Sequence, residues 1–303
     1  MNSAKLPLLL FGTVVRDARL ARLKGLIADC KKIPTLAILQ VGNLSESNAY
    51  IGRKKQFAEK IGAKVLHVKF SEKVTDDELI RKIGELNNNS EISGIILQLP
   101  IPKSLSKQKI IDAIYVSKDV DGLTSVNKKL FEMGDSRAVI PATARGVFSL
   151  LKAYKISVAR KKVTVIGRSA LVGSPIATLL EKEGAVVTVC HSKTENIPEK
   201  SRNADILIVA VGKPRFVTAD FVSPGQVVVD VGINSAQSDT DGASFAEKLE
   251  EEIPAKIIVG DVDFEAVKNI VSAISPVPGG VGPMTVLSLF ENLISAYEMQ
   301  SAS

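Results

Sequence analysis

The sequence lacks tryptophan, and aromatic residues make up only 5% of its 303 positions. Hydrophobic residues nevertheless account for 45% of the chain, so valine, isoleucine, leucine and alanine must form most of the protein core. This composition is typical of α/β proteins, in which buried parallel strands read as runs of aliphatic residues. The chain is long enough for one large domain or for two of ordinary size.

Cysteine and histidine are also scarce, with two of each. Cys30 and Cys190 form no Cys-x-x-Cys pattern, and two cysteines are too few for a disulfide framework, which indicates a reducing compartment. Neither histidine has a second metal-ligand residue at the spacing of a metal site, so we expect no bound metal.

Long hydrophobic runs and blocks of like charge are missing too. No apolar run approaches the roughly 18 residues that a membrane-spanning helix requires, and the stretch LPLLLF near the N-terminus is too short for a signal-peptide core. We therefore expect a soluble, cytoplasmic protein that does not bind membranes. The absence of basic runs interleaved with aromatic residues argues against nucleic acid as a partner. The formal net charge of +6 suits an anionic small ligand.

The first half of the chain alternates strand-like and helix-like segments. Compact apolar runs predict strands at 35–41, 64–68 and 94–99, and helical periodicity predicts helices at 48–61 and 76–87. Gly62 is expected to end the first helix, and Thr75 is expected to cap the start of the second. Strands that alternate with helices predict right-handed βαβ units and a parallel sheet.

A second alternating series begins near Pro141. It predicts helices at 146–154, 174–183 and 284–298, and strands at 162–166, 186–190, 206–211, 227–231 and 256–259, in a doubly wound pattern. The last helix follows a loop rich in proline and glycine, and we expect it to return to the first domain. The predicted fold is therefore α/β with two domains, each with a mainly parallel sheet flanked by helices: residues 1–145 plus 280–303, and a Rossmann-like domain at 146–279.

The segment VIGRSALVGSP, residues 165–175, runs from a predicted strand through a turn into a predicted helix. That is the context of a dinucleotide phosphate site, because the N–H groups and the dipole at a helix start favour phosphate. The glycines depart from the Gly-x-Gly-x-x-Gly pattern, since Ser169 stands at the second position. A tight turn without a ligand therefore remains an alternative.

The end of the following strand favours NADP over NAD. An NAD site usually carries an acidic residue there, which binds the ribose hydroxyls, whereas this chain has CHSKT at 190–194. This segment contains no acidic residue that would repel the 2′-phosphate of NADP. Arg168 in the preceding turn is a further candidate donor to that phosphate. His191 has the alternative interpretation of an ordinary polar residue at a strand end.

Four polar side chains of the first half are candidates for chemistry. In SNAYIGRKK, residues 47–55, the spacing of Tyr50 and Lys54 places both on one helix face. Gln98 lies in an apolar strand, and Asp121 lies in KDVDG, residues 118–122. Ligands of open α/β sheets bind beyond the carboxyl ends of strands, so these residues are expected to gather there.

Each of these residues also has an ordinary structural interpretation. Lys54 could be a solvated surface charge, Gln98 could cap a strand end, and Asp121 could only form a turn with Gly122. If they do gather, burial or nearby charge could lower the pKa of the lysine and make it a general acid or base. The glutamine could then orient the lysine, and the aspartate could accept N–H donors of a heterocycle. Arg53 and Lys55, about 100° to either side of Lys54, are expected to be ordinary exposed charges.

Taken together, these motifs resemble the bifunctional methylenetetrahydrofolate dehydrogenase/methenyltetrahydrofolate cyclohydrolase family. The resemblance runs over nearly the whole chain and rests on VGNLSESNAYIGRKK, GIILQLPIP, KDVDGLTSVN, VIGRSALVGSP, TVCHSKT, ADILIVAVGKP, VVVDVGIN, GDVDF and PVPGGVGPMT, in that order. Two segments depart from it: Pro141-Ala142-Thr143-Ala144 replaces the family's Pro-Cys-Thr-Pro, and FGTVVRDARL matches the family's opening poorly. Some relatives are fused to a formate-ligase domain, which we do not expect here.

The resemblance implies two coupled reactions. The first is the NADP-dependent oxidation of 5,10-methylenetetrahydrofolate to the 5,10-methenyl cation, and the second is hydrolysis of that cation to 10-formyltetrahydrofolate. It implies that Lys54 is the key acid/base residue of the hydrolysis and that Tyr50 contacts the folate. Gln98 would be the partner of the lysine, and Asp121 would hold the pterin ring.

The resemblance also implies two sets of binding residues and a homodimer. NADP would be lined by Gly167, Arg168, Ser169, His191, Ser192 and Ile233. A tetrahydrofolate substrate, possibly polyglutamylated, would be lined by Tyr50, Lys54, Leu97, Gln98, Leu99, Asp121 and the loop Pro278, Gly279, Gly280, Val281 and Gly282.

Two other functions remain open at this stage. One is a dehydrogenase with little cyclohydrolase activity, and the other is a non-catalytic regulator that binds NADP or folate. The combination of Tyr50, Lys54, Gln98 and Asp121 argues against the regulator, because a protein that only binds has little need of a positioned lysine.

Overall fold

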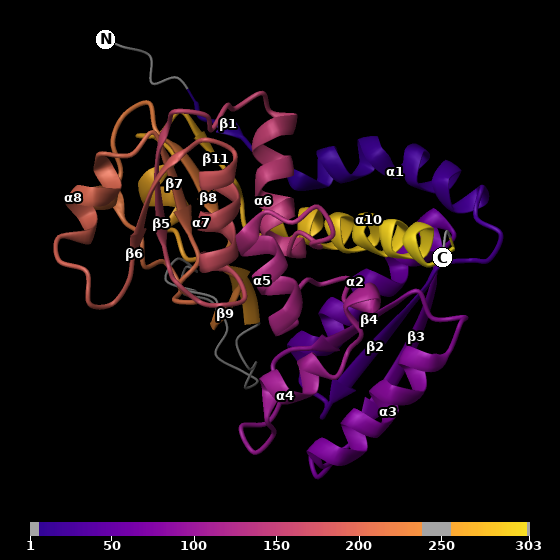
Figure 1. Ribbon diagram of the computed structural model, residues 1–303. Helices are drawn as coiled ribbons and strands as arrows, with labels where there is room; N and C mark the ends of the chain where they lie inside the picture. Colours follow the sequence, from indigo (N-terminus) through magenta and orange to yellow (C-terminus); the bar gives the residue numbers. More distant parts are fainter. Residues whose placement is uncertain (1–5, 238–255, 302–303) are drawn as a thin grey trace, which may run out of the picture. The chain divides into compact units, whose positions relative to one another are not determined.

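The structure is a computed structural model that describes residues 6–237 and 256–301. The chain divides into two compact units (Figure 1). The three-stranded unit comprises Val14–Ser149 and the chain from Pro283 onward, and the six-stranded unit comprises the chain up to Thr13 and Leu150–Gly282. Each unit contains a parallel sheet with helices, which confirms the predicted α/β class.

A parallel sheet with the strand order β3-β2-β4 forms the centre of the three-stranded unit. Its strands are β2 (Thr35–Val41), β3 (Lys64–Phe70) and β4 (Gly94–Gln98). The register places Gln40 of β2 opposite Lys69 of β3 and opposite Gln98 of β4. Because residues in register point to the same face of a sheet, these polar side chains share one face near the carboxyl ends of the strands.

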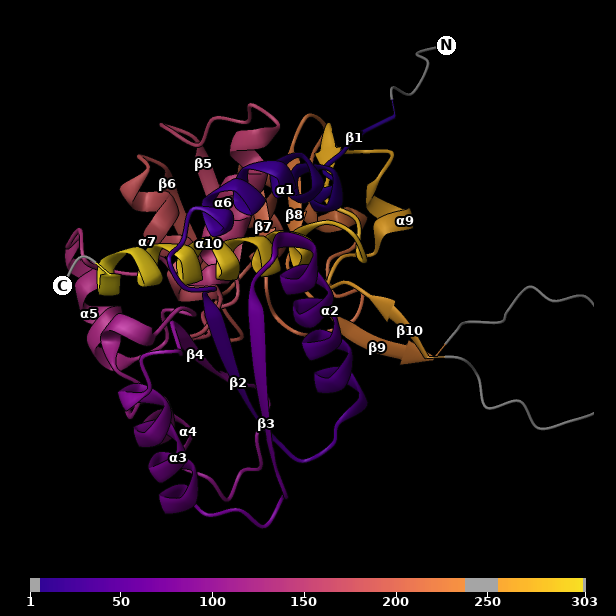
Figure 2. The same cartoon turned by 90° about the vertical axis from the view of Figure 1, so that its right-hand side faces the viewer.

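Helices cover both faces of this sheet, and Figure 2 shows α2 on one side of it and α3 on the other. The helices of this unit, some of which extend across its boundaries, are α1 (Gly12–Ala28), α2 (Ser45–Ile61), α3 (Asp76–Asn88), α4 (Lys107–Asp112), α5 (Ser125–Met133), α6 (Ala142–Ala153) and α10 (Val281–Ser301). The expected helix ends are confirmed: Thr75 and Glu78 form a capping box at the start of α3, and Gly62 ends α2 with φ +85°.

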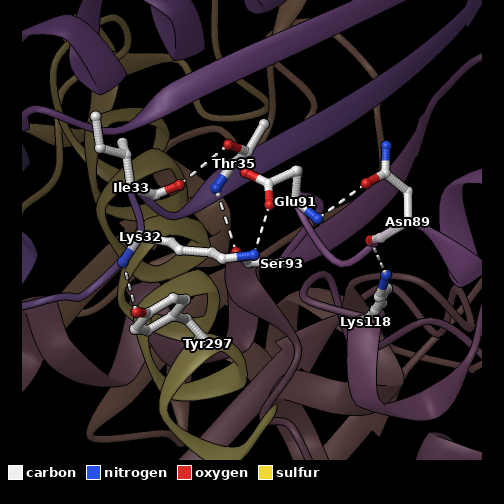
Figure 3. Close-up of polar contacts among 8 residues, drawn as sticks. All are labelled: Lys32, Ile33, Thr35, Asn89, Glu91, Ser93, Lys118 and Tyr297. Carbon is white, nitrogen blue, oxygen red and sulfur yellow. Dashed lines mark hydrogen bonds and ion pairs between the residues drawn. The ribbon is translucent and has the colours of Figure 1, made fainter. Parts of the chain in front are cut away.

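Hydrogen bonds tie the amino ends of β2 and β4 to α10 (Figure 3). Thr35 at the start of β2 donates its backbone N–H to the Ser93 hydroxyl oxygen, which lies 3.3 Å away. Lys32 pairs with Glu91 at 2.6 Å, and its backbone N–H donates to the hydroxyl of Tyr297 on α10 at 2.9 Å. The end of the sheet opposite Gln98 is thus closed by polar contacts.

Every strand of the larger sheet runs parallel to its neighbours, in the order β1-β11-β8-β7-β5-β6. The strands are β1 (Leu8–Leu9), β5 (Lys162–Ile166), β6 (Val186–Cys190), β7 (Ile206–Val209), β8 (Val227–Asp230) and β11 (Ala273–Ile274), and the helices are α7 (Gly173–Lys182), α8 (Ile197–Arg202) and α9 (Phe264–Val267). Leu207, Val228 and Ile274 of adjacent strands are fully buried, and they belong to one apolar core.

Two sequence-based expectations for this unit are wrong. The doubly wound pattern predicts that the strand at 256–259 joins the main sheet, but β10 (Lys256–Val259) pairs antiparallel with β9 (Asn234–Gln237). The predicted first domain includes the N-terminal segment, but β1 pairs with β11 and so belongs to the larger sheet. With two residues each, β1 and β11 are too short to show a hydrophobic period.

Both sheets have a topological switch point. In the smaller sheet β3 and β4 lie on opposite sides of β2, so the switch point lies after the carboxyl ends of β2 and β4, at Val41 and Gln98. In the larger sheet β6 and β7 lie on opposite sides of β5, so the switch point lies after Ile166 and Val209. Ligands of open α/β sheets bind at such points, which makes both edges candidate sites.

Candidate active site and cofactor loops

Lys54 and Gln98 meet at the switch point of the smaller sheet. The Lys54 Nζ donates a hydrogen bond to the Gln98 Oε1 at 2.8 Å. Gln98 is the last residue of β4 and is almost completely buried, and its Nε2 donates to the backbone carbonyl of Leu99 at 2.8 Å. Because the amide nitrogen is engaged by that carbonyl, the amide oxygen is fixed toward the lysine. The expected partnership of these two residues is therefore present.

Lys54 and Asp121 also influence each other electrostatically. Burial lowers the pKa of Lys54, and the nearby Asp121 partly offsets this effect. Burial raises the pKa of Asp121, while Lys54 opposes the rise and Asp119 adds to it. Both pKa values are thus displaced toward the neutral form of the group, as is common where a protein transfers protons.

The loop that carries Asp121 is held by the preceding aspartate. The buried Asp119 carboxylate accepts backbone N–H groups from Gly122, Leu123 and Thr124 at 2.8–3.1 Å. Asp119 also forms a parallel bridge with Ile95 of β4, which brings the loop beside the strand that carries Gln98. Asp119 is therefore the residue that places Asp121; the sequence marks both aspartates of KDVDG as polar candidates but does not predict this structural role.

Alanines occupy the segment that departs from the family pattern. Ala142 and Ala144 lie in the first turn of α6, and each is about 1% exposed. The backbone N–H of Ala142 donates to the backbone carbonyl of Asp121 at 3.4 Å. The segment thus packs directly beside the Asp121 loop, and small buried side chains fill the place of the family's cysteine and proline.

Arg53 is exposed, as expected, but Lys55 is only partly exposed and has a specific partner. The Arg53 guanidinium carbon lies 5.6 Å from the centroid of the half-buried Tyr50 ring, within the range of a cation–π contact. The Lys55 Nζ lies 3.1 Å from the Nδ1 of His67 on β3. The expectation fails for Lys55 because helical spacing alone does not show which residues of the neighbouring strand lie beside α2.

Two further residues of the expected folate set lie next to Gln98. Leu97 points away as a buried core residue of β4, and Leu99 is half-buried at the strand end. The expected loop from Pro278 to Gly282 belongs to the six-stranded unit and follows β11. In this loop a Cβ on Gly280 would come within 2.6 Å of the Pro276 carbonyl oxygen, so only glycine fits there.

Glycine is required at both ends of the cofactor turn. Gly167 has φ +122°, and a Cβ there would come within 2.1 Å of the Ala210 carbonyl oxygen at the end of β7. A Cβ on Gly173 would come within 2.2 Å of the Gly167 carbonyl oxygen. The turn therefore folds tightly over the switch point of the larger sheet, as the sequence context predicts.

Ser169 acts as a cap in this turn. Its hydroxyl oxygen accepts the backbone N–H groups of Val172 and Gly173 at 3.2 and 3.3 Å. Its backbone carbonyl also accepts from Ser174 N–H at 3.0 Å. The serine in place of the second glycine thus satisfies the first amides of α7, so these amides are not all available to a phosphate.

The turn after β6 presents hydroxyl and cationic groups. The His191 N–H donates to the Thr194 hydroxyl oxygen at 2.9 Å, and the His191 Nδ1 accepts from the backbone N–H of Lys193 at 3.1 Å. Ser192 and Lys193 are exposed. The side chain of Arg168 is exposed as well and pairs with no carboxylate within residues 6–237 and 256–301. This chemistry fits a phosphate better than a pair of ribose hydroxyls.

Two buried aspartates, Asp230 and Asp261, organise the remaining loops at the same edge, and neither is predicted from the sequence. Asp261 accepts four hydrogen bonds at 2.6–2.9 Å, and Asp230 accepts three at 2.9–3.0 Å. The donors to Asp261 are the backbone N–H groups of Val211, Gly212 and Lys213 and the Asn234 side chain, and the donors to Asp230 are the N–H groups of Gly232, Asp261 and Val262. These bonds fix the loop of Ile233, whose side chain is 40% exposed. The sequence signal for these two aspartates was their place in the motifs VVVDVGIN and GDVDF.

Burial raises the pKa of Asp230 to about 7 against the opposing backbone N–H groups. A carboxyl whose pKa is higher in the folded than in the unfolded state stabilises the fold below its unfolded pKa of about 4, and this contribution is lost as the pH rises through about 7. We expect urea denaturation to give a lower free energy of unfolding at pH 8.5 than at pH 5.5, with a smaller difference in Asp230→Asn. Asp77→Asn, at a side chain that is 93% exposed, is the control and should keep the parent difference.

Neither a membrane span nor a metal site is apparent in the described part of the chain. Within residues 6–237 and 256–301, no helix has the length and hydrophobicity to cross a membrane. In the same ranges, no three side chains of histidine, cysteine, aspartate or glutamate lie together as metal ligands would.

Comparison with known proteins identifies the family. Residues 10–121 match the model of the tetrahydrofolate dehydrogenase/cyclohydrolase catalytic domain, and residues 141–301 match that of the NAD(P)-binding domain. The chain is 43% identical over 265 residues to the bifunctional protein FolD of Rickettsia canadensis, which covers 88% of this chain and 86% of the relative. It also resembles the crystal structure of the bifunctional enzyme FolD from Campylobacter jejuni, at 38% identity and a TM-score of 0.88, over 96% of this chain and 99% of that one.

A further structure is that of the Trypanosoma brucei methylenetetrahydrofolate dehydrogenase-cyclohydrolase, complexed with NADP cofactor and an inhibitor. It is 29% identical, has a TM-score of 0.90, and the match covers 99% of this chain and 100% of that one. The chain therefore belongs to the tetrahydrofolate dehydrogenase/cyclohydrolase family and is a bifunctional enzyme of that family.

Proposed function

We propose that the protein oxidises 5,10-methylenetetrahydrofolate with NADP and hydrolyses the resulting methenyl cation to 10-formyltetrahydrofolate, with Lys54 as the acid/base residue of the hydrolysis. The observation that carries this assignment is the 2.8 Å hydrogen bond from the Lys54 Nζ to the Gln98 Oε1, beside Asp121 at a switch point. The match of residues 10–121 to the family's catalytic domain supports the same placement.

The hydrolysis needs a group that takes a proton and later returns it. Water attacks the methenyl carbon, and the neutral amine of Lys54 takes a proton from that water, which leaves a neutral tetrahedral adduct. The Lys54 ammonium then protonates N5 of the folate as the carbon–N5 bond breaks. The adduct hydroxyl loses its proton to solvent, so the formyl group stays on N10 and the net reaction releases one proton.

The environment of Lys54 suits this sequence. Burial lowers its pKa, which increases the fraction of neutral amine near neutral pH. Gln98 can only accept from the lysine through its fixed amide oxygen, so it holds the nitrogen in place without competing for its lone pair. Tyr50, one helical turn before Lys54 on α2, is proposed to contact the folate, and Asp121 is proposed to bind the pterin N–H groups.

NADP supplies a hydride acceptor for the oxidation, and the turns of the larger sheet are proposed to bind it. Gly167 and Ser169 shape the turn over the switch point, Arg168 and Ser192 are proposed to bind the 2′-phosphate, and Ile233 would contact the nicotinamide half. His191 shapes the second turn through its Nδ1. The exposed cation and hydroxyl, with no carboxylate among residues 190–194, support NADP over NAD.

Arg168→Ala tests the assignment of the 2′-phosphate. Loss of one charge-assisted contact should raise the KM for NADP by about 10- to 100-fold and leave the KM for NAD almost unchanged. Methenyltetrahydrofolate formation, followed by absorbance with each cofactor, measures both values, and equilibrium titration with NADP alone gives the affinity without turnover. Lys182→Ala on α7, outside both turns, is the control. A parent enzyme that prefers NAD would contradict the choice of cofactor.

Two broader assignments rest on composition and on the family resemblance. The scarcity of cysteine supports a reducing compartment, for which we propose the cytoplasm. The resemblance supports a homodimer. Light scattering of the purified protein tests the second assignment, and a molar mass equal to that of one chain at micromolar concentration would contradict it.

A further inference from the structure

The helix that carries Tyr50 and Lys54 has a polar attachment to each strand of the smaller sheet. Lys54 donates to Gln98 of β4 at 2.8 Å. Asn48 accepts from the Gln40 amide of β2 at 2.8 Å, and Lys55 bonds the Nδ1 of His67 on β3 at 3.1 Å. One of these attachments belongs to the proposed chemistry. The other two are joined to each other, because the His67 Nε2 lies 2.8 Å from the Gln40 Oε1.

The hydrogen bonds of this chain can run in one direction only. A lysine ammonium donates and never accepts, so the His67 Nδ1 must accept from Lys55. The proton of a neutral imidazole then lies on Nε2, which donates to the Gln40 Oε1. With its oxygen occupied, Gln40 turns its amide nitrogen toward the Asn48 Oδ1. Lys55, His67, Gln40 and Asn48 therefore form a chain, which we call the His67 relay.

The Gln40 link of the relay lies next to the proposed catalytic pair. Gln40 is opposite Gln98 in the register of β2 and β4, and its side chain is 1% exposed. A buried amide must have its hydrogen bonds satisfied, and His67 supplies the donor to its oxygen. If His67 stops donating there, the amide of Gln40 can turn over, and the attachment of Asn48 is lost with it.

We propose that neutral His67, which donates from Nε2, is a positioning residue for Lys54, because it holds two of the three attachments of α2 to the sheet. This role rests on the proposed hydrolysis. Protonation of His67 would turn Nδ1 into a donor that faces the Lys55 ammonium, so the contact would break. The hydrolysis should therefore weaken at acid pH through His67, in addition to the protonation of Lys54 itself.

The charges around His67 favour the neutral form. Lys55 faces His67 from α2, and Lys69 lies on β3, the strand that carries His67. Gln40 of β2 is uncharged, and among the described residues no acid faces His67 from these elements. Burial lowers the pKa of His67, and Lys55 and Lys69 lower it further. The pKa of His67 is therefore lower in the folded than in the unfolded state. His67 is then neutral and the relay is intact at neutral pH, and His67 becomes protonated only at a pH below the ordinary histidine range.

The first test measures hydrolysis of methenyltetrahydrofolate between pH 5 and pH 8.5, with a correction for the uncatalysed rate. In the parent enzyme log kcat should fall on the acid side with a slope above 1 over the pH range in which His67 titrates, because two groups titrate. His67→Gln, whose amide can both accept and donate but does not titrate, should keep kcat within about 3-fold at pH 7.5 and reduce the slope to about 1. His67→Phe, which fills the space without either bond, should lower kcat about 10-fold with little change in KM.

Lys64→Gln, at an exposed position of the same strand, is the control and should keep the parent slope. A merely structural role would lower the amount of folded protein without changing the slope. A His67→Gln enzyme with the parent slope, or a His67→Phe enzyme with the parent kcat, would contradict the positioning role.

The second test does not depend on turnover. Nitrogen-15 NMR of the imidazole rings should show His67 in the Nε2–H tautomer, and Lys55→Met should raise its pKa. An Nδ1–H tautomer, or a pKa unaffected by Lys55→Met, would contradict the relay. A parent enzyme that shows this tautomer but does not hydrolyse the substrate would instead contradict the proposed function, and with it the role of the relay in catalysis.

Discussion

Lys54→Met should lower the kcat of methenyltetrahydrofolate hydrolysis by about 10²- to 10⁴-fold, the range that a general acid/base group contributes. Methionine fills a similar volume but can neither take a proton from water nor return one to N5. It also leaves the Gln98 Oε1 without its donor, which should cost some stability. Hydrolysis of the purified methenyl compound, followed by loss of its absorbance, measures the effect directly.

The same variant should still bind folate, because Tyr50 and Asp121 are unchanged. Fluorescence titration with a folate ligand is expected to give a dissociation constant within about 10-fold of the parent value. Lys60→Met, at the exposed end of the same helix, is the matched control and should hydrolyse at the parent rate. Hydrolysis at the parent rate in Lys54→Met would remove the acid/base role of this lysine. A parent enzyme that oxidises its substrate but hardly hydrolyses the product would favour the dehydrogenase alone.

The parts of the site that the sequence could predict are those with a local signature. Tyr50 and Lys54 share a helix face because of their spacing, and Gln98 ends an apolar strand, so the carboxyl edge of a parallel sheet was the natural meeting point. The strands β2, β5 and β6 have the predicted bounds because each is a short run of mainly aliphatic and β-branched residues between turn signals. These features depend on residues close together in the chain.

The parts that could not be predicted depend on contacts across the fold. Asp119 and Asp261 are bound to backbone N–H groups, which are the same in every residue and leave no pattern in the sequence. The pairing of Lys55 with His67 requires the register between α2 and β3. Local periodicity also cannot assign β10 to a partner, because the strand reads alike whether it pairs in parallel or antiparallel. The misses therefore have one cause, which is that pairing between distant segments is decided by tertiary packing.

Asp121→Asn should weaken both reactions, in contrast to Lys54→Met. The proposed role of Asp121 is to bind the pterin ring, which the two reactions share, so kcat/KM for the oxidation and for the hydrolysis should each fall by about 10- to 100-fold. Asp121 raises the pKa of Lys54 against the lowering effect of burial, so removal of the Asp121 charge should lower the pKa of Lys54 below its value in the parent enzyme. The fall in the hydrolysis rate at acid pH, called the acid limb of the rate profile, should then move to lower pH where it results from protonation of Lys54. Rate profiles from pH 5 to 8.5 for both reactions measure these effects.

The adjacent aspartate separates this role from a loss of loop structure. Asp119→Asn would keep the shape of the side chain but would turn an amide N–H toward one of the three backbone donors that the carboxylate now accepts. It should therefore lower the free energy of unfolding by about 1–3 kcal/mol. Asp121→Asn should not destabilise the fold, because it removes a negative charge that the Asp119 carboxylate repels. If Asp121→Asn impaired only the hydrolysis, Asp121 would act through Lys54 rather than on the shared ring. A shift of the acid limb to higher pH would show that Asp121 does not support the charged lysine at all.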